Sequence, residues 1–209
     1  AFHWGALHGD KTGGIIPLCG TAKTTTQNWI TLEGCKLALQ SDVNYNNGDY
    51  ISPPKKGLKA FSRNYTSTLF DKEGYEEGLH LNLFDGFEDT ESYLNYMDSF
   101  FGSIDANDLL GMLNTWQIGD IGKHQKFNSN TKEALSNINC PALVMPSSTD
   151  LSFPARNNIP EVKEIPNAEL RVINTKYGHL AGGMSTALTS QEDVTFIDKQ
   201  IREFLKKIT

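Results

Sequence analysis

Three short apolar runs alternate with long stretches of helical periodicity along the chain. The runs at 14–19, 141–145 and 170–173 are too short for helices and are bounded by turn residues, so each predicts a buried strand. The stretch 20–128 is far longer than an ordinary connection between strands, so we expect it to form structure of its own. The pattern predicts an α/β protein whose mostly parallel sheet is interrupted by a large helical insertion.

Helical periodicity fills the insertion and the end of the chain. A first helix is expected over 24–40. Its apolar residues Trp29, Leu32 and Leu37 are predicted to face inward, and Asp105 lies where a later helix needs an N-cap. The aromatic stripes of this region are more typical of a packed core than of a ligand pocket, although a lid over an active site would use a few of them. Further helices are expected over 58–69, 93–101, 105–116, 130–137, 154–159 and 189–208.

An acid follows one predicted strand and a histidine follows the next. Asp150 comes shortly after the run 141–145, and His179 comes shortly after the run 170–173. Because chemistry in open α/β sheets lies beyond the carboxyl ends of the strands, adjacent parallel strands would bring both residues to one edge. There the acid would orient the imidazole, which would take the proton from a nucleophilic serine or cysteine. The alternative is an aspartate in a turn and an unrelated surface histidine, but the order of the two residues favours the triad.

The segments around these residues carry a family resemblance. Residues 149–154 read Thr-Asp-Leu-Ser-Phe-Pro, residues 165–170 read Ile-Pro-Asn-Ala-Glu-Leu, and residues 177–179 read Tyr-Gly-His. In this order they resemble the C-terminal part of the homoserine O-acetyltransferase family of the α/β-hydrolases. Further segments resemble the same family, namely 2–6, 19–23, 47–50, 57–58, 91–94 and 105–110.

The resemblance implies a partial α/β-hydrolase fold. Residues 1–19 and 129–209 would form the C-terminal part of its core, and residues 20–128 would form a helical lid. In that family a Gly-x-Ser-x-Gly turn with the nucleophilic serine comes immediately before the helix that the start of this chain resembles. No such motif occurs in the sequence, so we expect the serine to lie upstream of Ala1 and the chain alone to be inactive.

The resemblance further implies a double-displacement acyl transfer by Asp150, His179 and the upstream serine. An acetyl-CoA-type donor would acylate the serine, and an alcohol acceptor would then take the acyl group. Leu180 follows His179 where homoserine enzymes usually have an aspartate for the ammonium of the acceptor. An apolar side chain cannot do this, so another alcohol, or water in an esterase, is the expected acceptor.

Two interpretations stay open beside this one. The chain could be a truncated, non-catalytic remnant or binding module, whose sheet would then expose an apolar edge. Arg63, in the stretch 58–69, is either a solvent-exposed charge or a guanidinium that binds a substrate carboxylate through two parallel hydrogen bonds. The resemblance favours the second role, because an arginine at this place in the lid of the family helps to bind the amino acid acceptor.

Composition narrows the setting and the partners. The net charge of -6 argues against electrostatic binding to nucleic acid or to an anionic membrane. No apolar run approaches the ~20 residues of a membrane span. Cys19, Cys35 and Cys140 are far apart and show no metal-ligand spacing, so no metal site and no disulfide framework are expected. We expect a reducing, cytoplasmic setting without a signal peptide. The expected partners are a small acyl donor and an alcohol acceptor. Acetyl-CoA or another acyl-CoA would be a substrate, and no cofactor is expected. The formation of a homodimer stays an open possibility.

Overall fold

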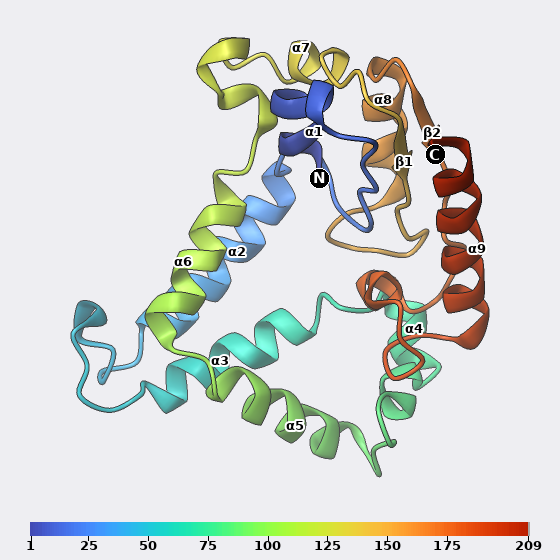
Figure 1. Ribbon diagram of the computed structural model, residues 1–209. Helices are drawn as coiled ribbons and strands as arrows, with labels where there is room; N and C mark the ends of the chain where they lie inside the picture. Colours follow the sequence, from blue (N-terminus) through green and yellow to red (C-terminus); the bar gives the residue numbers. More distant parts are fainter. Residues whose placement is uncertain (209) are drawn as a thin grey trace.

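The structure is a computed structural model that describes residues 1–208 (Figure 1). The strands and helices follow one another along the chain in the predicted order, and most of the helices lie between the predicted strand at 14–19 and the one at 141–145. The helices and strands are α1 (Phe2–His8), α2 (Thr26–Gln40), α3 (Lys55–Thr66), α4 (Lys72–Glu76), α5 (Thr90–Gly102), α6 (Ala106–Gln117), α7 (Thr131–Ser136), β1 (Ala142–Val144), α8 (Ala155–Glu164), β2 (Ala168–Leu170) and α9 (Gln191–Ile208).

The three predicted strands lie side by side and run parallel. β1 pairs with β2, with Val144 opposite Leu170. On the other side of β1, isolated bridges join Ile15 to Ala142 and Leu18 to Met145, also in parallel. β1 is buried along its whole length, which is why it is a continuous apolar run rather than an alternating one.

Helices cover both faces of this small sheet. Ala142 and Val144 belong to a hydrophobic cluster with residues of α1 and α7, whereas Leu143 and Met145 pack with α9. Successive side chains of a strand point to opposite faces, so the alternation places α1 and α7 on one face and α9 on the other. Figure 1 shows α8 on the same side as α1 and α7, with α9 running past the opposite side.

The insertion forms a separate hydrophobic cluster made by α2, α3, α5 and α6. In Figure 1, α2 and α6 run side by side away from the sheet, and α3 and α5 run side by side across their far ends. Asp105 caps α6 as expected, because its carboxylate accepts from the backbone N–H groups of Asn107 and Asp108. Ala22, Ile121 and Phe127 pack with the sheet cluster rather than with the insertion. The division into a core and a lid at 20–128 stays a prediction, and the two ends of the lid pack against the sheet.

The predicted inward face of α2 is partly wrong. Leu32 is buried, but Trp29 is 47% exposed and Leu37 is 59% exposed. The residues that face α3 and α6 are instead Leu32, Cys35 and Leu39. At 3.6 residues per turn, Leu37 lies about 140° around the helix from Leu32, so the two cannot share one packed face.

No helix within residues 1–208 combines the length and the hydrophobicity that a bilayer-spanning segment needs.

The corrected face of α2 predicts opposite effects for two leucines of the same helix. Leu32→Ala should lower the free energy of unfolding by about 2–5 kcal/mol, because it leaves a cavity in the cluster of the insertion. Leu37→Ala, the matched control, should change it by less than about 0.5 kcal/mol. Denaturant unfolding of both variants measures the difference, and equal destabilisation would contradict this packing.

Candidate active site

Asp150 and His179 lie together at the carboxyl edge of the sheet. Asp150 follows β1, His179 follows the segment after β2, and Asp150 Oδ2 lies 2.8 Å from His179 Nδ1. The carboxylate is buried, at 2% exposure for the residue, whereas the imidazole is about one-third exposed. The bond through Nδ1 leaves Nε2 as the ring nitrogen that can exchange a proton with a reacting group.

The backbone that follows Asp150 holds its other oxygen. Asp150 Oδ1 accepts from the backbone N–H of Ser152 at 2.8 Å and from that of Phe153 at 2.9 Å. This Asx-type turn satisfies a buried charge locally and fixes the direction of the carboxylate. Asp150 can therefore present Oδ2 to the imidazole without a second side chain to orient it.

Two hydroxyl groups tie the loop of the acid to the loop of the histidine. Ser148 Oγ donates to the carbonyl of Thr175 and accepts from its N–H, both at 3.1 Å. Thr149 Oγ1 donates to the same carbonyl at 3.0 Å and accepts from the N–H of Gly178 at 3.1 Å. These bonds continue the pairing of β1 and β2 beyond the strands, so the two loops leave the sheet as one unit. This role of the two hydroxyl groups was not predicted from the sequence, although hydroxyl residues shortly after a strand are a usable signal.

The insertion holds the histidine loop from the opposite side. The N–H of His179 donates to the carbonyl of Leu69 at 3.0 Å, just beyond the end of α3. Gly178 has φ +54°, and a Cβ there would lie 2.3 Å from the Leu69 oxygen, so a larger residue fits neither the backbone nor the space. Lys176 adds ion pairs with Glu73, at 3.2 Å, and with Glu77 of the adjoining segment.

The exposed side of His179 borders an open pocket of about 280 Å³. Its lining also includes Leu18, Leu180 and Leu188. The ring of Phe153 lies 5.3 Å from the imidazole between ring centroids and stacks on Trp116 in turn.

Cys19 borders the same pocket but is not an activated thiol. Its residue is 6% exposed, and burial, reinforced by the negative charge of Asp150, raises the pKa of the thiol to about 12. Nucleophilic cysteines need the thiolate, so Cys19 is protonated and unreactive near neutral pH.

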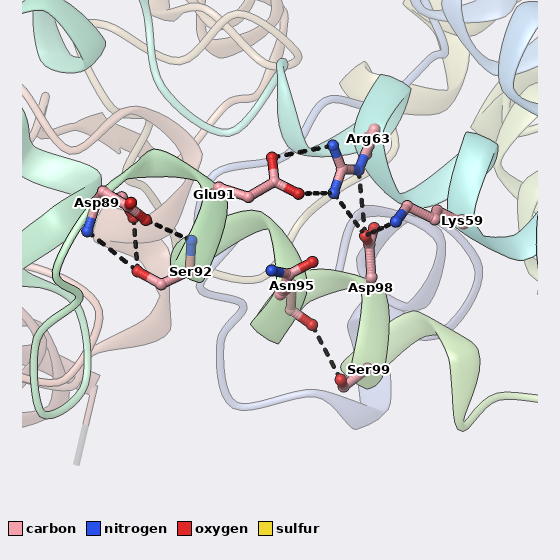
Figure 2. A network of polar contacts seen from close by, with 8 residues as sticks. All are labelled: Lys59, Arg63, Asp89, Glu91, Ser92, Asn95, Asp98 and Ser99. Carbon is pink, nitrogen blue, oxygen red and sulfur yellow. Dashed lines mark hydrogen bonds and ion pairs between the residues drawn. The ribbon is translucent and has the colours of Figure 1, made fainter.

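Arg63 lies away from this pocket, in an ion-pair network between α3 and α5 (Figure 2). Its guanidinium donates to Glu91 at 2.7 and 3.3 Å and to Asp98 at 3.1 Å. Lys59 lies 3.6 Å from the same Asp98 carboxylate. The substrate-carboxylate role of Arg63 stays a prediction, and it would require a ligand to displace carboxylates that already occupy the guanidinium.

Removing the Thr149 hydroxyl should destabilise the protein. Thr149→Val leaves the N–H of Gly178 without its partner, so the free energy of unfolding should fall by about 1–3 kcal/mol, whereas Thr149→Ser keeps the hydroxyl. Thr195→Val, on the exposed side of α9, is the matched control and should stay within about 0.5 kcal/mol. Thermal or denaturant unfolding tests this, and indistinguishable Val variants would contradict the role of the hydroxyl.

Comparison with known proteins finds esterases and homoserine O-acyltransferases similar to this chain. No family model matches the chain. A probable esterase of Corynebacterium glutamicum is 31% identical over 208 residues, covering 98% of this chain and 57% of that protein. A homoserine O-acetyltransferase of Chlorobaculum parvum is 24% identical over 192 residues, covering 90% of this chain and 53% of that protein.

Comparison with solved structures finds the same class of relatives as comparison of sequences. An acetylester hydrolase from Corynebacterium glutamicum matches with a TM-score of 0.88 and 30% identity, over 98% of this chain and 57% of that one. The chain thus spans somewhat more than half the length of the proteins it matches. The expected α/β-hydrolase fold and the resemblance to the homoserine O-acetyltransferases are confirmed. The chain belongs to the α/β-hydrolase superfamily, where its relatives are esterases and homoserine O-acyltransferases.

Proposed function

We propose that Asp150 and His179 are the acid and the base of a serine-dependent hydrolase of carboxylic esters. The observation that carries the proposal is the 2.8 Å bond between a buried carboxylate and an imidazole that is about one-third exposed, beyond the ends of adjacent parallel strands. Esterases among the relatives support this chemistry. The nucleophile would be a serine that precedes Ala1 in a longer polypeptide, because the 209 residues contain no Gly-x-Ser-x-Gly motif.

The geometry suits a two-step acyl transfer. His179 Nε2 would take the proton of the serine while the serine oxygen attacks the ester carbonyl, and Asp150 would hold the Nδ1 proton and stabilise the imidazolium. His179 would then give its proton to the departing alcohol, which leaves an acyl-enzyme. Water, deprotonated by the same imidazole, would release the acid and restore the serine. No step needs a metal or a resident cofactor.

The surroundings of His179 favour water over an amino acid as the acceptor. Leu180, Leu18 and Leu188 border the same pocket, and none of them can pair with an ammonium or a carboxylate group. Arg63, the group expected to hold a substrate carboxylate, is bound to Glu91 and Asp98 instead.

A second candidate is O-acyl transfer from an acyl-CoA to an alcohol other than homoserine. The similarity to a homoserine O-acetyltransferase favours it, and the same acid, base and serine would carry it. In this case acetyl-CoA or another acyl-CoA would be a substrate.

Loss of either residue should abolish ester hydrolysis. In the full-length polypeptide, Asp150→Asn and His179→Ala should each lower kcat/KM for a small acetate ester by roughly 10³–10⁴-fold, because the imidazole loses its orientation or is missing. His124→Ala, in an exposed loop, is the control and should hydrolyse the ester like the wild type. A loss of less than ten-fold in the His179 variant would overturn the proposal.

Product analysis should separate the two candidates. When the full-length polypeptide receives acetyl-CoA, an acetate ester and a short primary alcohol together, we expect free acetate from the ester and little acetylated alcohol. Chromatographic quantification of both products measures the ratio. Acetylated alcohol as the main product, formed at the expense of acetyl-CoA, would instead select the transferase.

A further inference from the structure

An apolar cavity of about 330 Å³ lies between α5 and the loop that follows His179. Five residues of α5 contribute to its wall, namely Tyr93, Tyr96, Met97, Phe100 and Phe101. The rest of the lining comes from Leu69, Leu83, Phe84, Leu180 and Leu188. Lysine, arginine, aspartate and glutamate are missing from its lining among the residues that the structure describes.

The cavity adjoins the pocket of His179. Leu180 and Leu188 line both spaces, so these two side chains form the shared boundary. Leu69, another residue of the cavity wall, supplies the carbonyl that accepts the N–H of His179. A ligand with its ester carbonyl beside the imidazole would therefore reach the cavity by extending past Leu180.

We propose that this cavity binds an unbranched alkyl chain or a phenyl group of the ester, an inference that rests on the proposed function. A cavity of roughly 150 Å³ lined by apolar side chains accepts benzene, and this one is about twice that size. A hexyl chain or a phenyl ring would fit, whereas a charged group would lose its hydration without finding a partner. The substrate class is thus esters with a medium-length apolar group on one side of the carbonyl.

The distribution of side chains around α5 supports an apolar ligand. Tyr93, Met97 and Phe101 follow one another at intervals of four residues, so they share the face that borders the cavity. Glu91 and Asp98 lie on the other side of the helix, where Figure 2 shows both reaching toward Arg63. The charges of this region are directed away from the cavity and are paired with each other.

A chain-length series tests the assignment in the full-length polypeptide. We measure kcat/KM for acetate esters of unbranched alcohols from methanol to octanol, and for ethyl esters of acids from acetic to octanoic. In one series kcat/KM should rise about four-fold for each added methylene, up to about six carbons. The series that rises identifies whether the alcohol or the acyl group enters the cavity, and two flat series would overturn the assignment.

Substitutions at Met97 locate the effect in this cavity. Met97→Trp should fill the space and lower the ratio of kcat/KM for the hexyl member of the responsive series to kcat/KM for its smallest member by roughly 100-fold. Met97→Ala should move the optimum to longer chains. Met112→Trp, on the exposed side of α6, is the control and should keep the wild-type profile. An unchanged profile in both Met97 variants would contradict the proposal even though hydrolysis itself continues.

Direct binding separates failure of the cavity from failure of the proposed function. Calorimetry with 1-hexanol should show binding to the wild type and to the Met112→Trp control, and at least ten-fold weaker binding to Met97→Trp. If no ester is hydrolysed but this difference is found, the proposed function fails and the cavity assignment stands. Equal binding to all three proteins would overturn the cavity assignment.

Discussion

The bond between the buried carboxylate of Asp150 and the imidazole of His179 is the interaction on which the site depends. A carboxylate with 2% exposure is costly to bury unless its oxygens are satisfied, and here both oxygens are. One oxygen is held by the turn that follows β1, and the other is left for the histidine. The parallel pairing of β1 with β2 is what brings these two residues, 29 positions apart in the chain, to within hydrogen-bonding distance.

The helical insertion helps to position the site residues and does not only cover the site. The carbonyl of Leu69, just beyond α3, approaches the histidine loop so closely that Gly178 cannot carry a side chain, and the same carbonyl fixes the backbone of His179. Tyr177 packs against the cluster of the insertion and also against the α9 side of the sheet. The position of the imidazole therefore depends on both parts of the protein. The apolar cavity forms where these parts meet.

Local sequence patterns were enough to predict the strands and the pairing of Asp150 with His179. Short apolar runs ending in turn residues predicted the three strand segments, and the acid and the histidine directly after them predicted the pair. The predicted inward face of α2 was partly wrong, since Leu37 lies about 140° around the helix from the buried Leu32. The contact of Gly178 with Leu69 and the pairing of Arg63 with Glu91 and Asp98 join residues far apart in the chain. Such contacts depend on how the helices are arranged in space, and no local pattern encodes them.

Covalent labelling of the full-length polypeptide with a fluorophosphonate tests most directly whether Asp150 and His179 activate a serine. Mass spectrometry would locate the adduct, and the labelling rate would report the activation of the nucleophile. We predict a single adduct on a serine that precedes Ala1, formed at least 100-fold more slowly when His179 is replaced by alanine. An adduct on a residue within positions 1–209, or equal labelling of the His179 variant, would contradict it.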